Sequence, residues 1–171
     1  MKNFELTVGE VTQMAILMEE KGMNFYRWAA GQFDEASIKN MFSRLAEEEK
    51  EHARVFQKIL ESVDSRVKVN SGRKRYFQLL AGAEEVFSSH RGIGPDTVKS
   101  PADALFYGIQ AEKDAILFYQ EMFNTAESQE VKDTLSKLLE QEKMHLVELR
   151  DSMDEVNNKI SMEVSTVRRR K

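Results

Sequence analysis

The chain has 171 residues, of which 41% are hydrophobic and 32% charged, and its formal net charge is −4. This length and composition predict one soluble domain, and the interleaved charges give no indication of a nucleic-acid or membrane partner. Because the sequence contains no cysteine, disulfides, thiolate catalysis and cysteine-ligated metals are excluded. The N-terminal segment is neither a signal peptide nor a membrane span, so we expect a cytoplasmic protein.

The predicted elements are all helices, because apolar residues recur at helical spacing and the chain has only two prolines and eight glycines. A first helix is expected from Thr7 to about Gln32, and Thr7 and Glu10 have the spacing of a capping box. A second helix is expected over about Asp34–Val63. The segment after it is too long for a tight turn and contains one short helical pattern, Tyr76–Phe87, which indicates a crossover connection.

Two further helices follow this crossover. Ser100 and Pro101 form a strong helix start signal, since serine caps a helix and proline suits its first position. The third helix is therefore expected to run from Pro101 to about Thr125. Ser128 can cap a fourth helix, which is expected to end at about Asn157.

Four helices with two short turns and one long crossover predict an all-α four-helix bundle of two hairpins over residues 1–160. Residues 161–171 end in a basic run and are expected to form a flexible C-terminal tail. The two hairpins also resemble one another. Setting residues 18–52 over residues 111–145 without a gap gives ten identities in 35 positions, which indicates an internal duplication.

Polar residues interrupt the apolar stripe of the second and fourth helices at matching places. Glu49 and His52 lie within the stripe of the second helix, and Glu142 and His145 do so in the fourth. Residues three apart on a helix are separated by about 60° and about 4.5 Å along the axis. Both side chains of each pair can therefore converge on one ion.

The first and third helices each add one glutamate, Glu19 and Glu112, which lies between small residues that would leave room for ions. These small residues are Ala15, Gly22, Gly108 and Ala115. Four carboxylates and two imidazoles buried without compensation would cost several kcal/mol each, which favours a metal site over a purely structural polar network. Two divalent cations would balance the four glutamates, and thiolate-free ligands with one imidazole per ion suit iron or manganese, with zinc possible.

The stretches "MEEKGMNFY" with "AEEEKEHA", "AEKDAILFY" with "EQEKMHL", and the crossover "KRYFQLLAGAEEVF" make the chain similar to single-domain, rubrerythrin-like diiron proteins of the ferritin-like superfamily. The resemblance covers almost the whole chain. It implies a ferritin-like bundle in which Glu49 and Glu142 bridge two iron ions, and in which Tyr26 and Tyr119 hydrogen-bond ligand carboxylates. The expected metal ligands are Glu19, Glu49, His52, Glu112, Glu142 and His145.

The resemblance also implies redox chemistry on peroxide or dioxygen, of peroxidase or oxidase type, in oxidative-stress or iron handling. A homodimer is expected, and an external electron-donor protein, because the cysteine-containing rubredoxin module of longer relatives is absent. Ala115 stands where the family has an additional glutamate, with Asp114 beside it, so metal binding is better supported than peroxide reduction. The alternatives are a ferroxidase that stores iron, a diiron oxygenase and a metal-binding bundle without catalysis.

Other polar residues of these segments are expected to lie on solvated surfaces. They are Glu47, Glu48, Glu51, His90 and Glu140.

Overall fold

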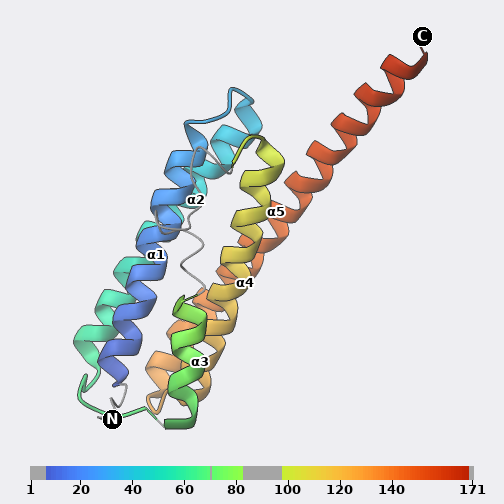
Figure 1. The fold of residues 1–171 in the computed structure, drawn as a ribbon. Helices are drawn as coiled ribbons and strands as arrows, with labels where there is room; N and C mark the ends of the chain where they lie inside the picture. Colours follow the sequence, from blue (N-terminus) through green and yellow to red (C-terminus); the bar gives the residue numbers. More distant parts are fainter. Residues whose placement is uncertain (1–6, 70, 83–97, 170–171) are drawn as a thin grey trace.

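The computed structural model describes residues 7–69, 71–82 and 98–169, and this part of the chain is helical apart from its connections and an isolated bridge between Thr7 and Lys68. Its helices are α1 (Val8–Ala30), α2 (Ala36–Ser62), α3 (Ser71–Gly82), α4 (Pro101–Thr125) and α5 (Gln129–Arg169). The prediction of an all-α helical bundle is confirmed, and α1, α2, α4 and α5 run along its length (Figure 1).

The first hairpin joins α1 to α2 through a short turn, and the two helices make extensive contacts along their length. Its start is the predicted capping box. The backbone N–H of Glu10 donates to Thr7 Oγ1 at 3.2 Å, and the backbone N–H of Thr7 donates to the Glu10 carboxylate at 2.7 Å. These bonds satisfy backbone groups that the first turn of a helix leaves without partners.

The second hairpin joins α4 to α5 and also begins as the sequence predicts. The backbone N–H of Asp103 donates to Ser100 Oγ at 3.2 Å, and Pro101 occupies the first helical position. Ser128 likewise accepts a hydrogen bond at 3.4 Å from the backbone N–H of Val131. Serine capping therefore fixes where both helices of this hairpin start.

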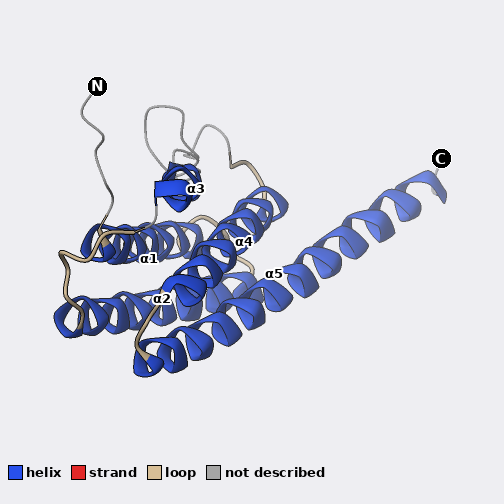
Figure 2. Cartoon of the chain, turned by 90° about the horizontal axis from the view of Figure 1, so that it is seen from below, coloured by secondary structure: helices blue, strands red, loops and turns tan. Residues whose placement is uncertain are grey.

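The last helix is longer than expected. Instead of ending at about Asn157, α5 continues to Arg169 and extends beyond the other helices (Figures 1 and 2). The residues after Asn157 include neither glycine nor proline, so nothing in the local sequence stops the helix. Lys159 still contacts Glu35 at the start of α2. Residues 161–169, which were expected to form a tail, are therefore helical.

The crossover contains the expected short helix, but α3 begins at Ser71, five residues before the expected start at Tyr76. The expected end at Phe87, and His90, lie outside the described residues. Helix α3 packs against α4 and α1, on the side of the bundle away from α2 and α5 (Figure 2). Phe77 is buried there with its ring 5.1 Å from that of Phe118.

The core has two apolar clusters with a polar layer between them. The Leu45 cluster includes Tyr26, Phe42, Leu45, Ile109 and Leu149. The Phe56 cluster includes Ile16, Phe56, Phe118, Tyr119 and Leu135. The polar layer consists of the buried residues Glu19, Glu49, His52, Glu112, Glu142 and His145. Along each long helix these polar residues are preceded by one cluster and followed by the other, so the layer lies in the middle of the bundle.

Candidate metal centre

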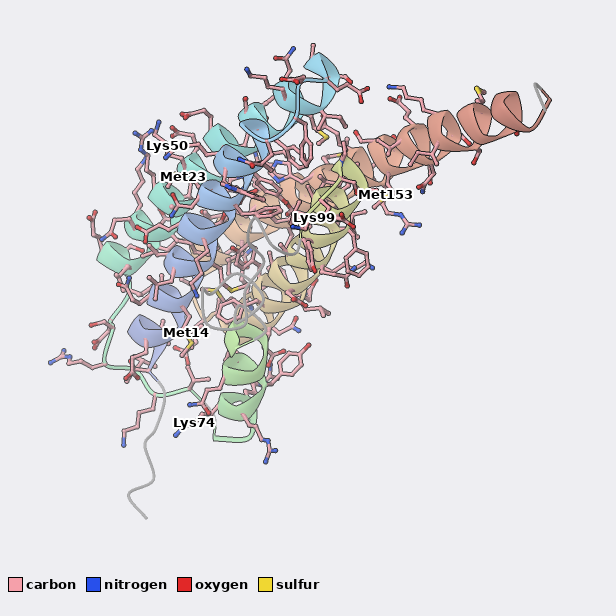
Figure 3. All side chains as sticks on the ribbon, turned by 45° about the horizontal axis from the view of Figure 1, so that its top comes forward. Met14, Met23, Lys50, Lys74, Lys99 and Met153 are labelled. Carbon is pink, nitrogen blue, oxygen red and sulfur yellow. The ribbon has the colours of Figure 1, made fainter. Side chains whose placement is uncertain are left out.

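The two Glu-x-x-His pairs meet inside the bundle. Glu49, His52, Glu142 and His145 are all buried, and each offers one ligand atom such that these atoms lie within 4.8 Å of one another. Lys50, one position after Glu49, instead points away from the bundle (Figure 3). Helical periodicity therefore directs Glu49 and His52 inward and Lys50 outward, as the sequence predicts.

Glu19 and Glu112 join this group from α1 and α4. An oxygen of Glu19 lies 3.7 Å from His52 Nδ1, and an oxygen of Glu112 lies 3.8 Å from His145 Nδ1. Each histidine is thus close to the glutamate of its neighbouring helix. The structure brings all six predicted ligands together, and their binding of metal stays a prediction.

Tyr26 and Tyr119 connect the two hairpins through this layer. The Tyr26 hydroxyl of α1 donates to Glu112 of α4, and the Tyr119 hydroxyl of α4 donates to Glu19 of α1. Burial raises the pKa of both tyrosines, and the nearby glutamates raise it further, so both hydroxyls keep the proton that they donate. The predicted contacts between these tyrosines and carboxylates are present.

Many polar atoms of the layer approach one another without forming hydrogen bonds. His52 Nδ1 lies 2.9 Å from an oxygen of Glu142, and His145 Nδ1 lies 3.2 Å from oxygens of both Glu49 and Glu142. Six buried side-chain atoms of these four residues nevertheless lack a hydrogen-bond partner. Buried polar atoms are rarely left without partners. Carboxylate oxygens and imidazole nitrogens that lie close together without hydrogen-bonding one another are suitable ligands for metal ions.

The electrostatics of the layer lead to the same conclusion. Burial raises the pKa of Glu19 and Glu112 well above the ordinary value, and the charge of Glu49 adds to this effect. Burial would lower the pKa of His52 and His145, but the surrounding carboxylates outweigh it and raise the pKa of both. Protons therefore compensate the charges when no cation is bound. Metal binding would release them.

Only some of the small residues make room beside the carboxylates. A Cβ atom added to Gly22 would lie 3.6 Å from Glu49 Cγ, so this glycine faces the polar layer. A Cβ atom added to Gly108 would instead meet Tyr26 at 3.1 Å and Leu149 at 3.3 Å. Gly108 therefore accommodates a tyrosine ring and not, as the sequence suggested, an ion.

One contact of the site has no signal in the sequence. Glu48 was expected on a solvated surface, but its side chain is only 38% exposed and one of its oxygens lies 2.9 Å from His145 Nε2. Glu48 and His145 belong to different hairpins, so no spacing within the sequence indicates this contact. Asp114 is half-buried, its pKa is raised by burial, and it is not part of the metal-ligating group found among the described residues.

Comparisons with known proteins agree with the fold. Residues 10–93 match the family model named Rubrerythrin, whereas no curated protein matches the chain. A protein from Thermotoga maritima, solved at 2.30 Å and provisionally described as a ferritin-like diiron-carboxylate protein, superposes with a TM-score of 0.68. The match covers 89% of this chain and 97% of that chain at 22% identity, which shows a common fold.

None of the helices in the described ranges has an apolar stretch long enough to cross a membrane. The family match includes most of α1 and all of α2 and α3, whereas the structural match covers 89% of the chain. This chain therefore has the ferritin-like fold, contains a buried Glu/His group, and is similar to the rubrerythrin family over residues 10–93.

Proposed function

We propose that this protein binds a dinuclear non-haem iron centre and reduces peroxide or dioxygen, as a peroxidase or oxidase in oxidative-stress or iron handling. The main support is the buried group of Glu49, His52, Glu142 and His145. One ligand atom of each residue lies within 4.8 Å of the others, and six side-chain atoms of the group lack hydrogen-bond partners. Carboxylates with one imidazole per ion suit iron, while manganese or zinc could occupy the same ligands. The rubrerythrin match favours iron.

The resemblance to rubrerythrins suggests the role of each ligand, and the near symmetry of the layer agrees with these roles. His52 and His145 would each bind one ion, and Glu49 and Glu142 would be shared between the two ions. Glu19 and Glu112 would complete the set. When bound, the ferrous pair supplies one electron per ion, and these two electrons with two protons reduce one hydrogen peroxide molecule to two water molecules.

Other residues prepare the site for this chemistry. The hydroxyls of Tyr26 and Tyr119 hold Glu112 and Glu19 in place across the hairpins. The Leu45 and Phe56 clusters exclude bulk water on both sides of the layer. Because the chain has no cysteine, we infer that a separate protein returns the electrons, and we expect the chain to act as a homodimer.

Anaerobic loading with ferrous iron followed by rapid mixing tests the proposal. We expect about two iron ions per chain, as in other carboxylate bundles of this type, and faster oxidation of the bound iron by peroxide than by dioxygen. The variant Glu49→Gln/Glu142→Gln should bind less than about one ion per chain, since each shared ligand loses its charge. The variant Glu47→Gln/Glu140→Gln changes exposed glutamates at equivalent places and should behave as wild type.

Two of the alternatives predict different results. Faster oxidation by dioxygen, with a large shell instead of a dimer in size-exclusion chromatography, would indicate a ferroxidase that stores iron. Oxidation of bound iron no faster than that of the glutamine variant would indicate a metal-binding bundle without catalysis. Absence of bound metal in the wild type would overturn the proposal entirely.

A further inference from the structure

The two ring nitrogens of His145 have different surroundings. Nδ1 faces the polar layer, 3.2 Å from oxygens of Glu49 and Glu142. Nε2 faces away from the layer and lies 2.9 Å from an oxygen of Glu48. A neutral histidine that binds a metal through one nitrogen carries its proton on the other, and a carboxylate at hydrogen-bond distance fixes this arrangement.

Glu48 is itself held in place. Arg44, one turn earlier on α2, lies 3.4 Å from the Glu48 carboxylate and also pairs with Glu148 on α5. Glu48, Arg44 and Glu148 therefore link α2 to α5 beside His145. All four residues line a groove of about 660 Å³ on this face of the bundle. Glu48 thus lies between the polar layer and solvent, with its orientation set by an arginine.

The other half of the layer lacks this arrangement. In the alignment of the two hairpins, the counterpart of Glu48 is Gln141 and that of Arg44 is Lys137. Gln141 is exposed, and His52 Nε2 is buried without a hydrogen-bond partner in the described part of the chain. The two histidines occupy equivalent positions, but only His145 has a carboxylate close to its Nε2 atom.

We propose that Glu48 is a positioning residue that accepts the Nε2 proton of His145 and makes the two metal positions unequal. This inference rests on the proposed dinuclear site. Glu48 holds the His145 ring so that Nδ1 faces the ions, and it increases the basicity of that nitrogen. The position bound by His145 therefore has the higher affinity and fills first. Loss of such a partner typically weakens metal affinity by about 10- to 100-fold.

Anaerobic titration of the full chain with cobalt(II), followed by the visible absorption of the bound ion, tests this inference. The wild type should bind two ions in two steps of different affinity. Glu48→Ala should weaken the tighter step by about 10- to 100-fold and leave the weaker step unchanged. Glu48→Gln retains an acceptor oxygen and should recover part of the loss. Glu51→Ala, an exposed change on the same helix, should have no effect.

The counterpart variant separates positioning from a general structural role. Gln141→Glu places a carboxylate in the other half, and it should strengthen the weaker step toward the affinity of the tighter one. Two equal steps in the wild type, or unchanged affinities in both Glu48 variants, would overturn this inference while leaving the dinuclear site intact. A wild-type chain that binds no cobalt would overturn the proposed function and this inference together.

Discussion

The apolar clusters and the polar layer are equally buried, yet burial affects their stability in opposite ways. Leu45 is fully buried one turn before Glu49, and Leu149 is fully buried one turn after His145. Burying a leucine side chain stabilises a fold by about 1.5–3 kcal/mol. A buried polar atom without a partner costs about 1–3 kcal/mol, and more if it is charged. Glu49 and His145 therefore require compensation that the leucines do not.

The loss of stability that a metal site requires is therefore confined to the polar layer. The two clusters stabilise the bundle whether or not cations are present. The polar layer is compensated by protons in the absence of metal, and by cations when they bind. Stability measurements with and without metal can therefore separate the two regions.

Metal removal should give the largest effect, and it should act through the polar layer alone. A ligand present at about 1,000 times its dissociation constant stabilises the folded state by about 4 kcal/mol. We expect the free energy of unfolding of the chelated protein to be lower than that of the iron-loaded protein by this amount. Its unfolding midpoint should therefore lie at a lower denaturant concentration. Equal unfolding midpoints under anaerobic conditions would contradict this prediction and the assignment of the layer as a metal centre.

A core truncation in the Leu45 cluster should act regardless of metal. Leu45→Ala removes a fully buried side chain, and such changes cost about 2–5 kcal/mol. We expect the same loss in denaturant unfolding of the loaded and the chelated protein. Leu17→Ala, at a leucine that is 43% exposed, is the matched control and should cost about 0.5 kcal/mol. A loss confined to the loaded protein would show that the cluster and the layer are not independent.

Replacing buried polar residues of the layer with apolar residues should stabilise the metal-free protein. Replacement of Glu49, His52, Glu142 and His145 together by leucine removes the orphaned atoms, and exchanging buried ionic groups for apolar ones stabilises some proteins by about 1–4 kcal/mol. We expect this variant to be more stable than the chelated wild type in urea and to be unaffected by iron. A less stable variant would contradict this prediction and would indicate that the protonated layer has no net cost.

The sequence predicts much of this arrangement because its signals are local or repeated. Thr7, Ser100 and Ser128 act through bonds within one helical turn, so their capping roles are readable from spacing alone. The buried Glu-x-x-His pairs are recognisable because they occur twice at the same place in two similar hairpins. The duplication also relates Tyr26 to Tyr119, whose crossed contacts with the glutamates follow from the approximate twofold symmetry.

The parts that could not be predicted depend on contacts between helices. The approach of Glu48 to His145 is set by how α2 crosses α5, and periodicity does not encode this crossing. The orientation of Gly108 toward Tyr26 depends on side-chain packing between α1 and α4. The end of α5 was wrong for a different reason, since no residue after Asn157 stops the helix and only the expected end of the bundle suggested a boundary.

The smallest predicted effects come from two glycines, one facing the polar layer and one facing the Leu45 cluster. The duplication pairs Gly22 with Ala115 and Gly108 with Ala15, so each glycine has an alanine counterpart in the other hairpin. An added Cβ at Gly22 would make ordinary contact at 3.6 Å with Glu49. An added Cβ at Gly108 would lie 3.1 Å from the ring of Tyr26 and 3.3 Å from Leu149.

The two glycine-to-alanine changes should therefore differ in sign. Alanine within a helix is favoured over glycine by about 0.8–1 kcal/mol, and Gly22→Ala should gain about this amount. At Gly108 the same gain is opposed by overpacking, which costs about 1–3 kcal/mol, so Gly108→Ala should be neutral to destabilising. Denaturant unfolding of both chelated variants checks the difference. Equal gains would mean that Tyr26 moves aside easily, and the Tyr26 bond to Glu112 should then weaken and lower metal affinity in Gly108→Ala alone.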